Sequence, residues 1–125
     1  MESRLAELVA SANHDGITAA MHGQFSSPPW VPGARSPAVF EALCAVGREM
    51  GLDLRAASSG GASDANKIAS TGIPVLDSLG PVGSDIHSPN ERVHVPSLVE
   101  RAKLSATFLT KIAAGEIQIP PSYGG

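Results

Sequence analysis

The stretch SPAVFEALCAVGREMGLDLRAA, residues 36–57, predicts a helix followed directly by a strand. Ser36 is expected to cap the helix, with Pro37 at its first position, and Gly51 is expected to end it. The stripe that should face a core consists of Val39, Leu43, Val46 and Met50. From residue 52 to 57 apolar and charged residues alternate as in a strand. A helix followed so closely by a strand is the αβ half of a crossover unit, so the expected fold class is α/β.

A glycine-rich turn, SSGGASDAN at residues 58–66, follows this strand and precedes a short helix that should end at Gly72. Two interpretations stay open. In one, the glycines let a ligand approach the backbone, and free N–H groups at the helix start bind an anion such as a carboxylate. In the other, the glycines only turn the chain, and Ser63 or Asp64 caps the helix. A nucleotide-binding loop is excluded, because neither the Gly-Lys-Ser/Thr ending nor the Gly-x-Gly-x-x-Gly fingerprint is present.

The run Ile73–Leu76 is expected to be a short buried strand that leads into the loop LGPVGSDIHSPNE, residues 79–91. Glycine and Pro81 prevent this loop from continuing as a helix or a central strand. Loops that follow the strands of open α/β sheets often carry the chemistry. His87 in this loop is therefore either an ordinary solvated histidine or a metal ligand through one ring nitrogen.

The C-terminal part predicts one long helix and a tail. Pro96 should open the helix, which should run to about Ala114. Its core stripe is expected to comprise Leu98, Ala102, Ser105, Leu109 and Ile112. Residues 116–125 are rich in proline and glycine and are expected to be a loose tail.

The N-terminal part predicts a helix, a strand and a linker. Residues 1–12 have the spacing of an amphipathic helix, and residues 17–22 alternate like a half-buried strand on which His22 is exposed. The proline-rich residues 26–35 are expected to be a crossing between two domains. Trp30 within them is either an anchor for the linker or a simple hydrophobic plug.

The composition excludes several classes of protein. The net charge of −3 gives no electrostatic footprint for nucleic acid. No apolar run is long enough for a membrane span, and no signal peptide is evident, so a cytoplasmic protein without a membrane partner is expected. The single Cys44 cannot form an internal disulfide. It lies on the apolar side of its helix and is expected to be a buried thiol rather than a nucleophile.

Four motifs in this order resemble a family of zinc exopeptidases and deacylases. They are SGGASDAN at 59–66, GIPVLD at 72–77, GPVG at 80–83 and HSPNE at 87–91. With the start of the closing helix, the resemblance covers residues 17–114. The family includes glutamate carboxypeptidase, acetylornithine deacetylase and succinyl-diaminopimelate desuccinylase, and this chain looks closest to the first of these.

The resemblance implies a catalytic α/β domain with a two-zinc site and a smaller inserted α+β domain for dimerisation and closure over substrate. Residues 1–25 would then be the last helix and strand of the inserted domain, and residues 26–35 the return linker. Residues 36–115 would form the second half of the catalytic domain, and residues 116–125 its tail.

The resemblance also implies site residues. His87 matches the family's last metal-ligand histidine, so zinc is the expected cofactor. The residues that match the glycine-rich turn near the substrate's carboxylate are Gly60, Gly61, Ala62 and Asn66. Ser63 and Asp64 are expected to hold this turn and its helix in place. No catalytic residue is assigned, because the family's His-x-Asp and Glu-Glu motifs belong to an upstream half and are absent here.

The expected function is a portion of a zinc-dependent metallopeptidase or amidohydrolase. It would hydrolyse the amide bond of a peptide or N-acyl amino acid with a free carboxylate, and this fragment alone would be inactive. Asn66 stands where some desuccinylase-like members have arginine, which argues against that substrate. A homo-oligomer is expected, because half a domain leaves apolar faces and sheet edges uncovered. The alternative is a non-enzymatic truncated module that acts through protein–protein contacts.

Overall fold

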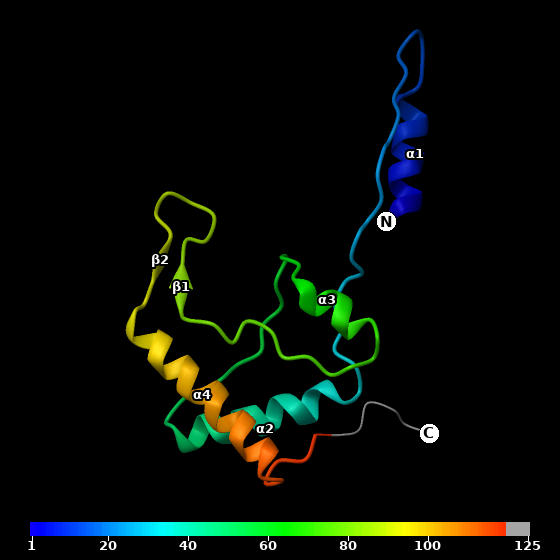
Figure 1. Ribbon diagram of the computed structural model, residues 1–125. Helices are drawn as coiled ribbons and strands as arrows, with labels where there is room; N and C mark the ends of the chain where they lie inside the picture. Colours follow the sequence, from blue (N-terminus) through cyan, green and yellow to red (C-terminus); the bar gives the residue numbers. More distant parts are fainter. Residues whose placement is uncertain (120–125) are drawn as a thin grey trace.

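The computed structural model describes residues 1–119, which contain four helices and one small sheet. In chain order the elements are α1 (Glu2–Ala12), α2 (Ser36–Glu49), α3 (Asp64–Ala69), β1 (Gly83–Ser84), β2 (Arg92–Val93) and α4 (Pro96–Ala113). Figure 1 shows α2 and α4 together at one side, with α3 and the β1–β2 hairpin beyond them. Helix α1 lies apart, at the end of an extended segment.

The core lies between α2 and α4. Its buried apolar side chains are Val39, Leu43 and Val46 from α2 and Leu104 and Phe108 from α4. Leu104 is 0% exposed and Leu43 is 1% exposed. The stripe expected for α2 is thus confirmed, with Met50 partly buried at its end. Each fully buried side chain of this size stabilises the fold by about 1.5–3 kcal/mol, so the helix pair holds the structure together.

The core stripe expected for α4 is confirmed only at Ile112, which packs against the core. Leu98 is 47% exposed and Leu109 is 63% exposed. The buried residues are instead Ser97, Leu104 and Phe108. Their spacing of seven and then four positions also places them on one helix face. The apolar pattern missed this face because it begins with a polar residue.

Ser97 is buried because its hydroxyl is fully hydrogen-bonded. Its Oγ accepts the backbone N–H of Val82 at 2.8 Å and donates to the carbonyl oxygen of His94 at 2.6 Å. A buried hydroxyl without such partners would cost free energy. Ser97 therefore fixes the base of the hairpin to the first turn of α4.

None of the three strands expected at 17–22, 52–57 and 73–76 is present. A strand needs a hydrogen-bonded neighbour, and within the described residues no partner strand lies beside these segments. Leu54 and Leu76 nevertheless pack against the α2–α4 core. The mixture of helices with a small sheet is compatible with an α/β class, but the expected crossover unit is not formed.

The one strand pair in the described part of the chain lies where a loop was expected, within residues 79–91 and just beyond. β1 and β2 pair antiparallel, with Gly83 opposite Val93. A Cβ on Gly83 would lie 2.9 Å from the carbonyl oxygen of Arg92, so the close pairing requires glycine. The expected loop is therefore mostly the tip of a hairpin.

Helix α1 forms as expected but has no buried residue. The segment after it folds back along the helix: Asn13 Nδ2 donates to the carbonyl oxygen of Val9 at 2.7 Å, and Asn13 Oδ1 accepts the N–H of Ala19 at 2.8 Å. His22 is exposed, as expected. An isolated helix of 11 residues is marginal in water, so α1 depends on these few bonds.

The glycines expected to end three of the helices lie just after the last helical residues. Gly51, Gly72 and Gly115 have left-handed φ values of 75°, 83° and 76°, which a residue without Cβ adopts without strain. The expected cap of α2 is wrong by one position: Ser36 is the first helical residue and is buried, and Arg35 holds the cap position.

Two further expectations concern Cys44 and the tail. Cys44 is buried, as expected for a structural thiol. Within the expected tail, Ile117 and Ile119 pack against the α2–α4 core, so this part is not loose. Residues 120–125 lie outside the described residues. None of the helices found in residues 1–119 has both the length and the apolar character that a membrane crossing requires.

Candidate functional site

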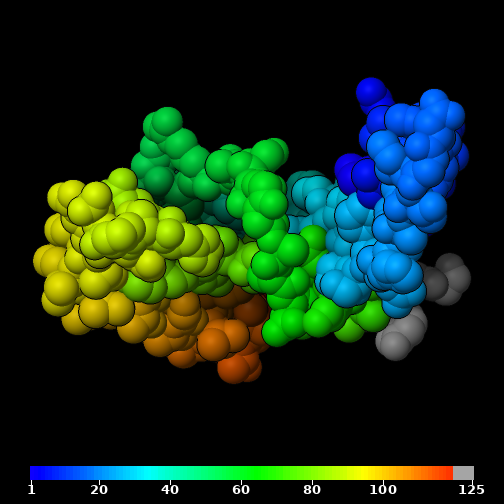
Figure 2. Space-filling view, turned by 90° about the horizontal axis from the view of Figure 1, so that it is seen from above, coloured from blue at the N-terminus to red at the C-terminus, as the bar shows by residue number. Residues whose placement is uncertain are grey.

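The glycine-rich turn lines a groove of about 1390 Å³. The turn and the start of α3 form one wall, and residues 1–3, 25–30 and 32 form the opposite wall. In Figure 2 the groove is seen between the blue N-terminal lobe and the green turn. The groove residues include all four expected substrate contacts, Gly60, Gly61, Ala62 and Asn66. The structure thus brings these four residues together.

Gly60 and Gly61 leave free space beside the backbone. A Cβ on Gly60 would meet no heavy atom within 4 Å, and a Cβ on Gly61 would meet Ser59 Oγ at 3.6 Å. Neither residue has a left-handed backbone. The turn therefore needs glycine neither for its own conformation nor for its own packing. Close approach of a ligand to the backbone is a use that remains for these glycines.

Ser63 caps α3 in a reciprocal arrangement with Asn66. Ser63 Oγ accepts the N–H of Ala65 at 3.1 Å, and Asn66 Oδ1 accepts the N–H of Ser63 at 3.0 Å. This is a capping box, and it confirms that Ser63 holds the turn and its helix in place. Because the cap already uses these N–H groups, the geometry supports the capping interpretation better than an anion site at the helix start.

The same two residues also reach other segments. Asn66 Nδ2 donates to the carbonyl oxygen of Pro28 at 3.0 Å, and Ser63 Oγ donates to Asp77 Oδ2 at 2.7 Å. The sequence reasoning missed Asp77, which also lines the groove. A carboxylate directly after the apolar run at 73–76 is the signal that could have found it, since such positions often carry a site's polar groups.

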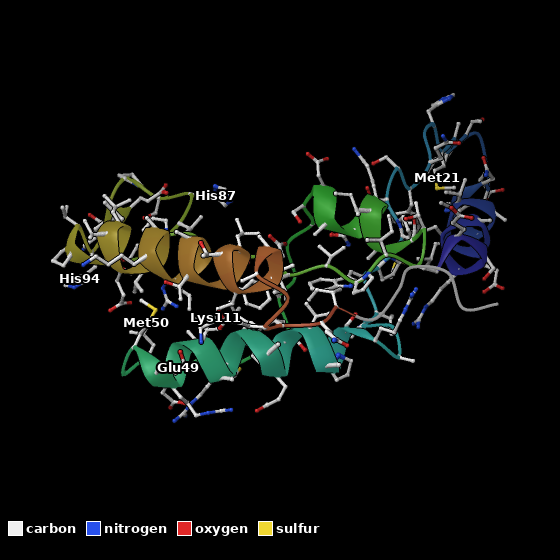
Figure 3. All side chains as sticks on the ribbon, turned by 60° about the horizontal axis from the view of Figure 1, so that its bottom comes forward. Met21, Glu49, Met50, His87, His94 and Lys111 are labelled. Carbon is white, nitrogen blue, oxygen red and sulfur yellow. The ribbon has the colours of Figure 1, made fainter. Side chains whose placement is uncertain are left out.

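His87 lies in the tip of the β1–β2 hairpin and does not line the groove. Its side chain is exposed, and its backbone N–H donates to Glu91 Oε2 at 3.2 Å. Its φ of 66° is left-handed, as is the φ of 56° at Asp85. Such conformations cost on the order of 1–3 kcal/mol and gather at functional sites. In Figure 3 the hairpin with His87 and the segment with Met21 lie far apart along the molecule.

The part of the chain that the structure describes holds no complete set of metal ligands around His87. Within residues 1–119 no group of three or more His, Cys, Asp or Glu side chains comes together. Near His87, Glu91 accepts the backbone N–H described above, and Asp85 Oδ2 accepts the hydroxyl of Ser84 at 3.0 Å. A catalytic zinc ion usually takes about three protein ligands. A metal site that includes His87 would therefore need companion ligands from outside the described residues.

Comparison with known sequences agrees with the four motifs. Residues 11–111 match the family described as Peptidase family M20/M25/M40. A succinyl-diaminopimelate desuccinylase of Psychromonas ingrahamii is 34% identical over 113 residues, which cover 89% of this chain and 29% of that protein. Proteins of the same name from Pseudomonas syringae pv. tomato and Pseudomonas fluorescens are 37% and 39% identical over 83 residues, 66% of this chain and 21% of each relative. No solved structure matches.

The chain spans less than a third of the length of these three relatives. The residues matched to the family include both the glycine-rich turn and His87. Asn66 was expected to argue against a desuccinylase, but all three relatives are named succinyl-diaminopimelate desuccinylase. They do not support the expected nearness to glutamate carboxypeptidase.

Proposed function

The chain belongs to Peptidase family M20/M25/M40, and on this premise we propose that it is the C-terminal portion of a zinc-dependent amidohydrolase. The complete enzyme would hydrolyse the amide bond of a peptide or N-acyl amino acid that has a free carboxylate. The observation that supports this most is His87, an exposed histidine on a strained hairpin tip inside the residues matched to the family.

Each part of the chain has a proposed role in that enzyme. His87 would hold a zinc ion, and the bound ion would supply Lewis acidity that polarises the amide carbonyl and lowers the pKa of water. Backbone N–H groups of Gly60 and Ala62 would place the free carboxylate of the substrate, and that of Gly61 would join them by leaving Ser59 Oγ, to which it donates at 3.2 Å. The general base and the other metal ligands would lie in the part of the relatives that this chain does not span.

The domain boundaries stay as proposed from the sequence. Residues 1–25 would end an inserted domain, residues 26–35 would return the chain, and residues 36–115 would complete the catalytic domain. The separation of α1 from the α2–α4 pair in Figure 1 fits this division. With one metal ligand, the chain alone would be inactive, and a cytoplasmic location remains a prediction.

The test compares His87→Ala with His94→Ala. Both histidines are exposed and belong to the hairpin region, so His94 controls for general effects of the substitution. The 125-residue chain alone should bind zinc weakly in calorimetry, because it supplies one of about three required ligands. Joined to its upstream part, it should hydrolyse N-acyl amino acids.

In the joined protein His87→Ala should weaken zinc binding by at least about 100-fold, since even the loss of an outer partner of a ligand costs 10–100-fold. His94→Ala should leave zinc affinity unchanged. Equal behaviour of the two variants would show that His87 is not a ligand. Tight zinc binding by the chain alone would show that companion ligands exist within it.

The second candidate is a non-enzymatic module that acts through protein contacts, and the exposed face of α4 favours it. The large apolar residues on this face are Val95, Leu98, Val99 and Leu109, with exposed fractions of 64%, 47%, 59% and 63%. Exposed apolar side chains on one helix face are suited to protein contacts, and they also support the proposed homo-oligomer.

Sedimentation velocity of the 125-residue chain tests this face. We expect self-association, which Leu109→Lys should reduce because it places a charge in the apolar patch. Thr110→Lys adds the same charge at the next exposed position and should leave association unchanged. A monodisperse wild-type monomer would remove the support for both the oligomer and the module.

A further inference from the structure

We propose that Asn66 is a positioning residue that joins the linker, residues 26–35, to the glycine-rich turn, and that it does not contact the substrate. The sequence grouped Asn66 with the substrate contacts, but the geometry assigns it to the scaffold of the groove. The inference rests on the proposed function only in taking the glycine-rich turn as the part that binds the substrate carboxylate.

Both ends of the Asn66 amide are already engaged within the chain. The oxygen accepts the N–H of Ser63 at 3.0 Å, and the nitrogen donates to the carbonyl oxygen of Pro28 at 3.0 Å. The amide oxygen has two lone pairs and the amide nitrogen two hydrogens, and one of each is used in these bonds, which together fix the orientation of the amide group. The oxygen therefore holds the turn while the nitrogen holds the linker, 38 residues earlier in the sequence.

The linker is held a second time near its other end. Arg35 Nη2 donates to the carbonyl oxygen of Gly72 at 2.6 Å. Asn66 lies in the first turn of α3, and Gly72 follows shortly after its last turn. The two bonds thus tie the linker to the two ends of α3. Loss of the Asn66 bond would release the end nearer to α1 while the Arg35 bond still holds the other.

This arrangement lets Asn66 set the width of the groove. Pro28 and Trp30 line it from the linker, and Gly60 and Gly61 line it from the turn. Asn66 is bonded to both walls through one rigid amide group. A linker that moves away from α3 would therefore widen the groove, while the N–H of Ser63 keeps its acceptor on Asn66.

Trp30 fluorescence of the 125-residue chain reports on the linker, because Trp30 is its single tryptophan, is half-buried and lines the groove. Asn66→Asp keeps the acceptor for Ser63 but replaces the donor to Pro28 with a carboxylate oxygen. Loss of one ordinary hydrogen bond should raise the population with a released linker about fivefold. We expect red-shifted emission and stronger quenching by acrylamide, with helix content unchanged in circular dichroism.

Two control variants separate the linker tie from the helix cap. Ser63→Ala weakens the cap of α3 but leaves both atoms of the Asn66 amide bonded to backbone groups, so Trp30 emission should stay as in the wild type. Lys67→Ala removes only an exposed pair with Asp64, 3.4 Å apart, and should change nothing.

The proposal is overturned if Asn66→Asp leaves the emission and quenching of Trp30 unchanged. It is equally overturned if Ser63→Ala changes them as much as Asn66→Asp does, because Trp30 would then report on loss of the helix. These measurements need neither zinc nor substrate. Their failure would leave the proposed hydrolase function standing, and a failed zinc or activity test would leave the role of Asn66 standing.

Discussion

The α2–α4 pair and the N-terminal arm, residues 1–25, have the same helical spacing of apolar residues, but these residues form a buried core in the pair and are not buried in the arm. Each contains a helix with apolar residues at helical spacing. In the pair, Leu104 is 0% exposed, whereas in the arm Leu8 is 58% exposed and α1 has no buried residue. Periodicity therefore shows which side of a helix is apolar, but it does not show whether a partner covers that side.

Helix α4 has both a covered and an uncovered apolar face. One face, with Leu104 and Phe108, packs on α2, and another face, with Leu98 and Leu109, is exposed. Within the described residues, α2 is the helix that contacts α4 extensively. The face that meets a partner is set by long-range contacts, so the two faces of α4 should respond differently to the same substitution.

The largest expected effect is that of Leu104→Ala. Truncation of a fully buried leucine removes its burial and leaves a cavity, which should lower the free energy of unfolding by about 2–5 kcal/mol. Leu109→Ala, the same change on the exposed face of α4, should cost under about 0.5 kcal/mol. Urea denaturation followed by circular dichroism measures both. Equal losses would mean that the two faces of α4 are buried alike.

The next effect concerns α3, which lies between the pair and the arm. Ser63→Ala removes the side-chain cap and the bond to Asp77, and should destabilise α3 locally by about 1 kcal/mol. Hydrogen exchange of the Ala65 amide measures this directly, because that N–H donates to Ser63 Oγ. Ser70→Ala at the other end of α3 is the control. Unchanged exchange in Ser63→Ala would mean that the cap contributes nothing.

Alkaline pH should weaken the pair, because two of its groups hold their protons more tightly when folded. Burial raises the pKa of the Cys44 thiol above 9.0, and the hydrogen bond to Glu49 raises the pKa of Lys111 above 10.5. Lys111 Nζ lies 2.9 Å from Glu49 Oε2, between α4 and α2 (Figure 3). A raised pKa means that the folded state binds more protons at high pH than the unfolded state does.

The contribution of Cys44 should therefore be complete below pH 9.0 and be lost above it, and that of Lys111 should be lost only above pH 10.5. Urea midpoints across this range should fall in two steps. Cys44→Ala should remove the first step and Lys111→Met the second. A midpoint that does not change with pH would show that neither proton is linked to folding.

Much of the local structure could be predicted from the sequence because its signals are local. The stripe of α2, the glycine that ends it and the cap at Ser63 depend on residues within a few positions of each other. The expected strands failed for the opposite reason. Residues 52–57 and 73–76 alternate or are apolar like strands, but a strand forms only when another segment supplies hydrogen-bond partners.

In the candidate site, too, the features that depend on nearby residues could be predicted, and those that depend on distant residues could not. The glycines of the turn and the position of His87 outside the helices follow from short motifs. The bond from Asn66 to Pro28 joins residues 38 positions apart, and the bond from Ser63 to Asp77 joins residues 14 apart. Neither bond leaves a local pattern, although the position of Asp77 directly after the apolar run does. The buried face of α4 was missed because Ser97 is polar, and its burial depends on a hydrogen bond to Val82.

The smallest expected effect is that of Leu8→Ala in the arm. Since Leu8 is 58% exposed, the substitution removes little buried surface and should change the free energy of unfolding by under about 0.5 kcal/mol. Asn13→Ala in the same arm should do more to α1, because it removes the bonds to Val9 and Ala19 that hold the returning segment. Hydrogen exchange across α1 compares the two variants. If Leu8→Ala lowered the free energy of unfolding nearly as much as Leu104→Ala, α1 would have to be covered in solution, for example by a second copy. The arm and the pair would then not differ in burial as they do in the structure.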